Sequence, residues 1–254
     1  MEWDSTFFGT QMGVLVRTAE PAGETPAERT ASLHAALAAA LDTARAGEYA
    51  HVIFRAPAAD FEAIWAAEGA GLRLVDVGVD STIDLEAAPG ARWQALPGEG
   101  AVRPAREADL SGLQDLAAGA FVLSRFAADP FFSPSQVEAF HRAWVANLYR
   151  GLAQATLVRE VDGQVAGFVT CALHGQEGRI PLIATGAGYR RRGLGRSLVE
   201  AALGWFAGAG ARLVRVKTQA HNYAALALYH RAGFTVTQTE LTFSAAPSGE
   251  RRQP

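Results

Sequence analysis

The chain has 254 residues, of which 49% are hydrophobic, so it can bury the core of one large domain or of two modest ones. Its 23 basic and 26 acidic residues give a net charge of -3, and this near balance gives no indication of a nucleic-acid partner. The single cysteine, Cys171, excludes an internal disulfide and a cysteine metal cluster and is typical of a reducing compartment.

The start of the chain and its hydropathy favour a cytoplasmic protein. Residues 1–4 carry acids where a secretory signal carries bases, and no apolar run reaches the roughly 18 residues that a membrane span needs. We therefore expect no membrane association. The six histidines show no paired ligand spacing, so we also expect no metal site.

The first ninety residues contain a strand pattern at 52–54, a helix-capping residue type at Asp60 and a turn at Gly71-Leu72. From Glu86 to Glu99, two Pro-Gly steps interrupt the periodic pattern. We place the domain boundary in this segment. The predicted organisation is an N-terminal domain at 1–90, a linker at 91–100, a second domain at 101–246 and a disordered tail at 247–254.

The second domain begins with two amphipathic helices, predicted at 106–121 and 135–148. A β-hairpin follows at 155–161 and 164–173, because Asp162-Gly163 suits a two-residue turn. The remaining elements alternate between strand and helix. They are a strand at 180–185, a helix at 193–209, a strand at 213–216, a helix at 222–232 and a strand at 234–243.

The stretch from Tyr189 to Arg196 has the features of a phosphate-binding turn. It follows an apolar strand and opens an amphipathic helix with Arg-Arg-Arg-Gly-Leu-Gly-Arg. Free N–H groups in a first helical turn and the helix dipole attract anions, and glycine lets a phosphate approach closely. The arginines add charge-assisted hydrogen bonds, which favours a diphosphate. The endings of a nucleotide-triphosphate loop and of a dinucleotide fingerprint are both missing.

The N-terminal domain repeats the end of the chain at a constant offset of 162 residues. Val52-Ile53-Phe54 matches the strand at Val214, Asp60 matches Asn222, and Gly71-Leu72 matches Gly233-Phe234. The same offset sets Ala31-Ser32-Leu33 against Gly193-Leu194-Gly195, and Ala67 against Tyr229. We therefore expect a half copy that has lost the anion site and the tyrosine. The alternative is a chance similarity of two strand-helix-strand units.

Two linked motifs resemble a known superfamily, the GCN5-related N-acetyltransferases (GNAT). The acetyl-CoA loop of that family, Arg/Gln-x-x-Gly-x-Gly/Ala, matches residues 190–195, and its late Asn, Leu-Tyr and Gly-Phe block matches Asn222, Leu228-Tyr229 and Gly233-Phe234. The resemblance implies an α/β (α+β) GNAT fold with a mixed, mostly antiparallel central sheet, preceded by a smaller degenerate GNAT-like N-terminal domain. It also implies acetyl-CoA as the cosubstrate.

The resemblance further implies which residues act. Strand residues 183–185 are expected to hold the pantetheine through backbone hydrogen bonds, residues 190–196 the pyrophosphate, and Asn222 the cofactor arm. The predicted cofactor-binding residues are Ile183, Ala184, Thr185, Arg190, Arg191, Arg192, Gly193, Leu194, Gly195, Arg196 and Asn222. Helix capping by itself explains Asn222 equally well.

Tyr229 is the predicted catalytic acid. The pKa of a phenol is near 10 and that of a thiol about 8.5, so full proton transfer to a thiolate is uphill by roughly 2 kcal/mol. We therefore expect Tyr229 to hydrogen-bond to the departing thiolate, with transfer as charge builds. The alternative is a half-buried helix tyrosine without a chemical role.

A narrower likeness covers most of the chain. Trp3-Asp4, Phe7-Phe8-Gly9, the stretch from Ala120 to Phe126 and the late block together resemble the dTDP-fucosamine acetyltransferase family of cell-surface polysaccharide synthesis. That family N-acetylates an amino sugar carried on dTDP. The likeness implies a nucleotide-linked amino sugar as the acceptor, and we expect Arg125 to bind a phosphate and Phe126 a ring face. Surface charge and core packing explain these two residues equally well.

The predicted reaction is direct attack of the acceptor amine on the thioester, because no Ser or Cys lies beside a His in the expected site. The general base is not assigned, since the loop at 175–178 can place His174 and Glu177 in solvent. Two other functions stay open: a peptide or ribosomal-protein N-terminal acetyltransferase, and a non-catalytic acyl-CoA-sensing module, against which Tyr229 argues. The oligomeric state is also open, with a homodimer among the alternatives.

Overall fold

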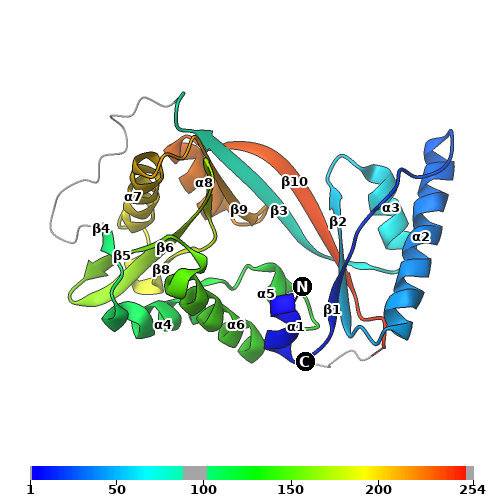
Figure 1. Cartoon of the computed structure of the whole chain (residues 1–254), viewed down its shortest axis with the longest axis horizontal. Coiled ribbons are helices and arrows are strands. Elements are labelled where there is room, and N and C mark those ends of the chain that lie inside the picture. Colours follow the sequence, from blue (N-terminus) through cyan, green and yellow to red (C-terminus); the bar gives the residue numbers. More distant parts are fainter. Residues whose placement is uncertain (1, 88–101, 250–254) are drawn as a thin grey trace. The chain divides into compact units, whose positions relative to one another are not determined.

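The computed structural model describes residues 2–87 and 102–249. The chain divides into two compact units (Figure 1): unit 1 comprises residues 1–78, 123–136 and 238–254, and unit 2 comprises residues 79–122 and 137–237. These units differ from the predicted domains, because two segments that follow the predicted linker belong to unit 1. The predicted linker at 91–100 and residues 250–254 of the predicted tail lie outside the described residues.

Unit 1 is a small sheet with helices. Its elements are α1 (Glu2–Phe8), β1 (Met12–Leu15), α2 (Pro26–Ala46), β2 (His51–Pro57), α3 (Phe61–Gly69), the first part of β3 (Arg73–Asp84), α5 (Arg125–Ala128) and most of β10 (Thr235–Ala245). Strand β2 pairs in parallel with β1 and antiparallel with β10. In Figure 1, α2 and α3 lie side by side next to these strands. The core that they share is apolar, with Leu33, Leu37, Phe54 and Phe243 buried in it.

Unit 2 contains the remaining elements. They are β4 (Val102–Pro104), η2 (Glu107–Asp109), α4 (Leu110–Ala120), α6 (Pro134–Asn147), η3 (Leu148–Leu152), β5 (Ala155–Val161), β6 (Gln164–His174), β7 (Glu177–Ile180), β8 (Ile183–Thr185), η4 (Ala187–Tyr189), α7 (Leu194–Gly208), β9 (Leu213–Gln219) and α8 (Tyr223–Ala232). The strand order is β3-β9-β7-β6-β5-β4, and β8 pairs with β6 off this path. The pairs β4-β5, β5-β6, β6-β7 and β6-β8 are antiparallel, while β7-β9 is parallel. The predicted mixed, mostly antiparallel sheet is therefore confirmed.

Helix α7 covers the sheet of unit 2 with the apolar face that its periodicity predicted. Leu198, Ala202 and Phe206 recur every fourth residue and are fully buried among strand residues such as Val169 and Val214. The helix ends at Gly208, and Gly210 just beyond its C-cap has a φ of 82°, a conformation that glycine tolerates best. This packing fixes the first turn of α7 against the end of the sheet.

The offset of 162 residues recurs in the backbone hydrogen bonds. Ile64 N–H donates to Asp60 O, and Leu226 N–H donates to Asn222 O; likewise Leu72 donates to Ala67, and Phe234 to Tyr229. The helix caps also correspond. The Asp60 side chain accepts from Ala63 N–H and the Asn222 side chain from Ala225 N–H. The local structure of β2-α3-β3 is thus repeated by β9-α8-β10.

The two copies differ at the positions equivalent to the predicted anion-binding turn and to Tyr229. Helix α2 begins at Pro26, two turns before the position equivalent to the start of α7, and a capping box of Thr25 and Glu28 satisfies its first N–H groups. Ala31-Ser32-Leu33, the counterpart of the anion-binding turn, therefore lies inside a helix. Ala67, the counterpart of Tyr229, is fully buried. Neither position presents a group to a ligand.

The last strands of the two copies are exchanged. The final strand of the first copy, β3, lies beside β9 in the strand order of unit 2. The final strand of the second copy, β10, pairs with β2 in unit 1, with Phe243 opposite Phe54. Each unit therefore completes its sheet with a strand from the other copy.

Candidate active site

A gap opens in unit 2 where two parallel strands part. Residues 177–180 of β7 pair with residues 213–216 of β9, but the chain then turns at Pro181-Leu182 and continues as β8. Strand β8 pairs with β6 through Ile183, Ala184 and Thr185. In the part of the chain that the structure describes, β8 and β9 do not pair. The backbone edge of β8 that faces away from β6 is thus available to a ligand.

The hydroxyl of Thr170 holds the chain at the point where the strands part. The Leu182 N–H donates to Thr170 Oγ1 over 3.0 Å, and the Thr170 N–H donates to Leu182 O over 2.9 Å. Thr170 is fully buried, so these bonds are not shared with solvent. They keep the chain on β6 and away from β9, which maintains the gap.

The first turn of α7 presents unpaired donors, as the sequence predicted. Gly193 is the N-cap, with a φ of 82°, and the first N–H that bonds within the helix is that of Ser197, which donates to Gly193 O. The N–H groups of residues 194–196 therefore point out of the helix end. A Cβ on Gly193 would meet no atom within 4 Å, so space is open above this turn. Gly195 instead packs against Leu228 of α8.

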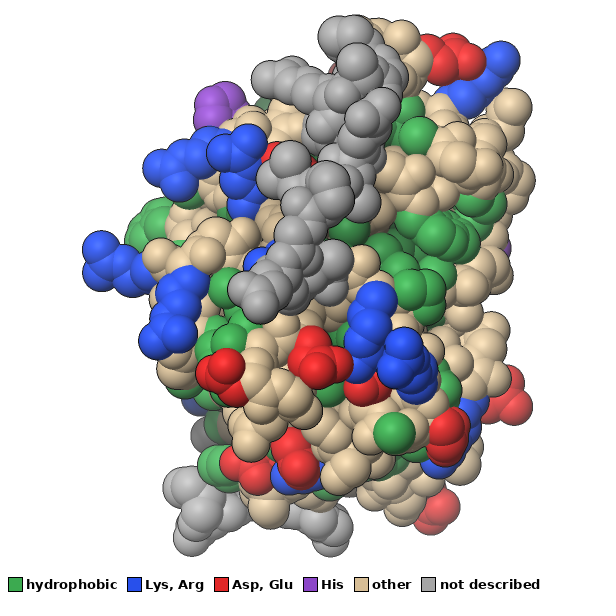
Figure 2. All heavy atoms as spheres, turned by 90° about the vertical axis from the view of Figure 1, so that its left-hand side faces the viewer, with side chains coloured by type: hydrophobic (Ala, Val, Ile, Leu, Met, Phe, Trp, Pro, Cys, Tyr) green, Lys and Arg blue, Asp and Glu red, His purple; other side chains and the backbone are tan. Residues whose placement is uncertain are grey.

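Arginine side chains surround this turn. Arg190, Arg191 and Arg192 are exposed. Arg196 is also exposed, but its Nε donates to Glu200 of the same helix over 2.7 Å, so part of its charge is already compensated. Figure 2 faces the side of unit 2 on which α7 lies, and Lys and Arg side chains project there into solvent. The first three arginines are therefore the better candidates for phosphate contacts.

Tyr229 lies on α8 with its ring buried. It is 4% exposed and its ring centroid is 5.8 Å from that of Phe234. Burial raises the pKa of Tyr229 above its usual value, so the phenol keeps its proton at neutral pH. The hydroxyl makes no hydrogen bond to any described residue. Tyr229 can therefore donate a proton or a hydrogen bond, and it cannot serve as a base.

Residues 122–234 match the family model described as Acetyltransferase (GNAT) family. This stretch of the chain is therefore similar to a GNAT domain. The strand gap, the glycine turn and Tyr229 all lie within the matched residues.

Two curated relatives match longer stretches of the chain than the family model does. The chain is 36% identical over 138 residues to the dTDP-fucosamine acetyltransferase of Escherichia coli O6:H1, which covers 53% of this chain and 58% of that protein. It is 26% identical over 149 residues to the spore coat polysaccharide biosynthesis protein SpsD of Bacillus subtilis, which covers 59% of this chain and 52% of that protein. The chain thus spans about half the length of the curated relatives it matches.

Solved structures share the fold over more of the chain. A tandem GNAT protein from the clavulanic acid biosynthesis pathway superposes with a TM-score of 0.58 at 15% identity, over 85% of this chain and 70% of that one. At this identity the likeness shows the fold alone. The predicted GNAT fold is therefore confirmed.

Asn222 serves as the N-cap of α8. Its Oδ1 accepts from Ala225 N–H over 3.3 Å, and its Nδ2 donates to Thr218 Oγ1 over 3.1 Å. These two bonds explain the residue without a cofactor, and they leave one N–H of the amide for the predicted contact.

The two residues considered as a general base do not form one here. His174 is exposed at the end of β6, opposite Glu177 in the register. The Glu177 carboxylate accepts from Arg215 Nε over 2.7 Å, so one of its oxygens is already occupied. The described residues therefore give no support to either side chain as the base.

Arg125 and Phe126 belong to the segment of the GNAT match that lies in unit 1. Phe126 is buried beside Phe8 and Phe132, and the Arg125 guanidinium lies 3.8 Å from the centre of its ring. The nearest carboxylate oxygen to Arg125, on Asp4, is 3.6 Å away, and burial lowers the pKa of Arg125 to about 10. Phe126 thus positions Arg125 and does not offer the free ring face that we expected.

A buried contact between a histidine and a carboxylate in unit 1 escaped the sequence reasoning. His51 Nε2 lies 2.8 Å from Asp129 Oδ2, and both side chains are almost fully buried. Burial alone would raise the pKa of Asp129, but the hydrogen bond and the charge of His51 outweigh it, and the pKa is lowered. The sequence marked Asp129 only as part of a loop before Pro130, because its partner is 78 residues away.

The described residues contain no group of three or more His, Cys, Asp or Glu that could hold a metal ion. None of the described helices is long and apolar enough to cross a membrane.

Proposed function

We propose that this protein is an acetyl-CoA-dependent N-acetyltransferase whose acceptor is the amine of a nucleotide-linked amino sugar. The observation that carries the proposal is the presence, in unit 2, of a strand gap, a glycine-capped helix N-terminus and a buried protonated tyrosine. These three features come from 183–185, 190–196 and 229, which are the residues that the GNAT motifs pointed to.

The first two features suit the two parts of coenzyme A. The open edge of β8 offers N–H and C=O groups to the amides of pantetheine, as a neighbouring strand would. The N–H groups of residues 194–196 and the exposed arginines at 190–192 suit a pyrophosphate. When bound, acetyl-CoA supplies a thioester that an amine attacks directly and from which a thiol departs.

Tyr229 supplies the acid. Because its hydroxyl is protonated and without a partner among the described residues, it can donate a hydrogen bond to a departing sulfur. No covalent enzyme intermediate is needed, since the one cysteine is fully buried and burial raises its pKa to about 12. A water molecule is our candidate for accepting the amine proton.

The acceptor class follows from the relatives. One relative is named dTDP-fucosamine acetyltransferase and another a spore coat polysaccharide biosynthesis protein, and both names point to sugar chemistry. Within this proposal, Arg125 is the predicted contact for the acceptor phosphate, because its guanidinium lies 3.8 Å from the centre of the Phe126 ring and this contact restricts its orientation. Changing Arg125 to Lys, which keeps the charge and loses the planar fork, should raise the KM for the acceptor about tenfold at an unchanged KM for acetyl-CoA.

Acceptor profiling tests the proposed function. Rates with acetyl-CoA are measured for dTDP-linked amino sugars, UDP-linked amino sugars and peptides with free N-termini. We expect turnover on a nucleotide-linked amino sugar. Activity on peptides alone would establish the N-terminal acetyltransferase alternative, and tight acetyl-CoA binding without turnover on any amine would favour an acyl-CoA-sensing module.

A further inference from the structure

Strand β1 is an open edge of the sheet in unit 1. It pairs with β2 on one side and is the first strand in the sheet order. The Ser5 hydroxyl bonds to both the N–H and the C=O of Met12, so these two groups point away from β2 and are already paired with α1, and the edge is open only from Val14 onward. Because the direction alternates along a strand, the N–H and C=O of Val14 point the same way. Val14 and Val16 are 37% and 71% exposed, and residues 12–15 carry no charge to protect the edge.

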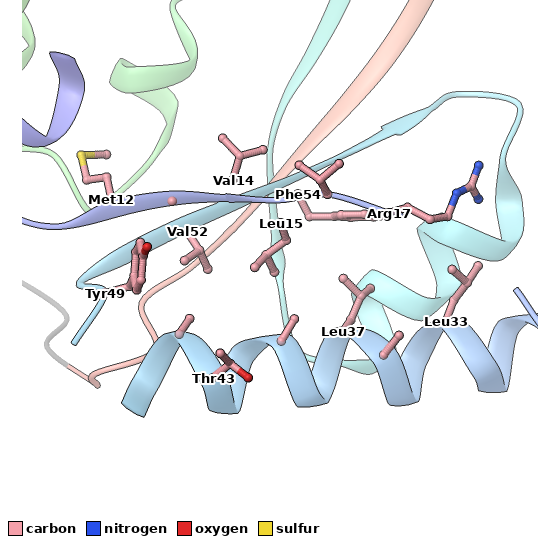
Figure 3. Close-up of a pocket in the computed structure, with 15 residues that line it drawn as sticks. Met12, Val14, Leu15, Arg17, Leu33, Leu37, Thr43, Tyr49, Val52 and Phe54 are labelled. Atoms are coloured by element: carbon pink, nitrogen blue, oxygen red, sulfur yellow. The ribbon is translucent and has the colours of Figure 1, made fainter. Parts of the chain in front are cut away.

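A groove of about 610 Å³ runs between this strand and α2 (Figure 3). Its lining is mainly apolar and comes from β1, α2 and the start of β2. In Figure 3, Leu15 projects toward α2 while Val14 projects to the other side of the strand. On α2 the groove is lined by Leu33 and Leu37 and by the small residues Ala36, Ala40, Thr43 and Ala44. An exposed apolar groove beside an open strand is typical of an interaction surface.

The internal repeat shows what fills this place in unit 2. Gly13 pairs with Val52 in parallel, and Gly178 of β7 pairs with Val214, which is Val52 plus 162. Strand β1 therefore stands in unit 1 where β7 stands in unit 2. On its other side β7 has an antiparallel neighbour, β6, which places Leu173 opposite Gly178. No strand takes that place beside β1 in the described residues of this chain.

Helix α2 of unit 1 also has smaller side chains than helix α7 of unit 2 at equivalent positions. The offset of 162 sets Ala36 and Thr43 against Leu198 and Trp205, which are larger. Helix α7 uses Leu198 in the core that it shares with β5 and β6. Helix α2 has smaller side chains on this face, and the groove is the space that they leave.

We propose that two copies of this chain associate through β1, antiparallel and across a two-fold axis beside Val14, so that each copy supplies the strand that the groove of the other lacks. An antiparallel pair of identical strands is what a two-fold axis generates. With Val14 opposite Val14, Leu15 of the second copy lies opposite Gly13, which reproduces the pairing of Leu173 with Gly178. Leu15 points toward α2 and enters the groove beside Tyr49, whose ring packs against Gly13. The proposal is independent of the proposed acetyl transfer.

A crosslinking experiment tests the axis itself. The one cysteine of the chain, Cys171, is fully buried, so a new surface cysteine is the sole accessible thiol among the described residues. Val14→Cys places two thiols on residues about 5.5 Å apart at Cα, within the range for a disulfide. Val16→Cys is the matched control, because residues 16 of the two copies are separated by about 13 Å although this position is more exposed. We expect a covalent dimer on a non-reducing gel for Val14→Cys alone.

Light scattering after gel filtration tests the groove. We expect twice the monomer mass for the wild type, and a dissociation constant raised at least tenfold by Ala36→Arg, which places a charge on the exposed groove face of α2. Ala31→Arg, on the same helix outside the groove, should leave the dimer intact. A monomeric wild type, a dimer that Ala36→Arg leaves unchanged, or equal crosslinking of the two cysteine variants would overturn the proposal.

Discussion

At the scale of single residues, two glycines with the same backbone conformation mark opposite ends of α7. Gly193 and Gly210 both have a φ of 82°, and a Cβ on either would meet no atom within 4 Å. An alanine at either position therefore introduces the same backbone strain, of about 1 kcal/mol or more, without a steric clash. The two positions differ only in what lies nearby.

This pair separates binding from stability. We expect Gly193→Ala and Gly210→Ala to lower the free energy of unfolding by similar amounts, while Gly193→Ala alone weakens acetyl-CoA binding, by about tenfold. Isothermal titration calorimetry and chemical denaturation measure the two effects. Equal acetyl-CoA affinity in the two variants would place the cofactor elsewhere.

Tyr229 gives a second prediction at the residue scale. Replacement by Phe keeps the buried ring and removes the hydroxyl, so acetyl-CoA affinity and stability should stay near the wild-type values. Turnover should fall by about 10²-fold or more if the hydroxyl acts as the acid. Steady-state kinetics and the thermal midpoint measure these quantities together. Unchanged turnover would remove the acid role and leave Tyr229 as a core residue.

At the scale of elements, a buried carboxylate joins β4 to the start of α4. Asp109 accepts two hydrogen bonds from Arg103, at 2.7 and 2.9 Å, and one from the Arg106 N–H. The hydrogen bonds from Arg103 lower the pKa of Asp109 below its usual value. A lowered carboxyl pKa in the folded state stabilises the fold above the unfolded pKa, near 4, and this contribution is lost as the pH falls through the folded pKa.

Asp109→Asn tests this link. The variant should be less stable by about 2 kcal/mol at pH 7, because charge-assisted bonds are lost. The difference from the wild type should shrink as the pH is lowered below 4. Asp115→Asn, which breaks an exposed pair with Arg142, is the control and should change stability little at any pH. A constant difference for Asp109→Asn across this pH range would contradict the assignment. Urea denaturation at several pH values gives the comparison.

At the scale of the whole molecule, the exchanged strands make the two halves of the sequence depend on each other. Ile83, in the last strand of the first copy, and Leu85, just after that strand, are buried in the core of unit 2 with Val214 and Phe234. The Leu85 N–H also donates to Arg212 O over 2.8 Å. A chain that starts at residue 101 has lost this strand and must expose the edge of β9 and the apolar side chains beside it.

We therefore expect residues 101–254 alone to lack a cooperative thermal transition. A chain that ends at residue 249 keeps every described element and should unfold like the full-length protein. Circular dichroism on heating measures both. A cooperative transition of the 101–254 fragment within a few degrees of the full chain would show that the predicted domain at 101–246 folds by itself.

The sequence by itself determined the structural features that depend only on residues close to one another in the chain. The helix beginning at Gly193, the cap at Asn222, the turn at Gly233 and the repeat at 162 residues are encoded by short patterns, because capping, periodicity and positive φ are local effects. The predicted cofactor-binding turn at 190–196 is also encoded by local residues, and the structure has it at the start of α7 as expected. The role of its residues in binding stays a prediction.

Only the tertiary structure decided which strands pair and which polar groups are buried. Strands β3 and β10 have similar local patterns, and either sheet offers them hydrogen bonds, so their exchange depends on long-range packing. The pairing of His51 with Asp129, the stacking of Arg125 on Phe126 and the open edge of β1 likewise join or separate residues far apart in the chain. A local pattern carries no information about such partners, because burial is a property of the assembled fold.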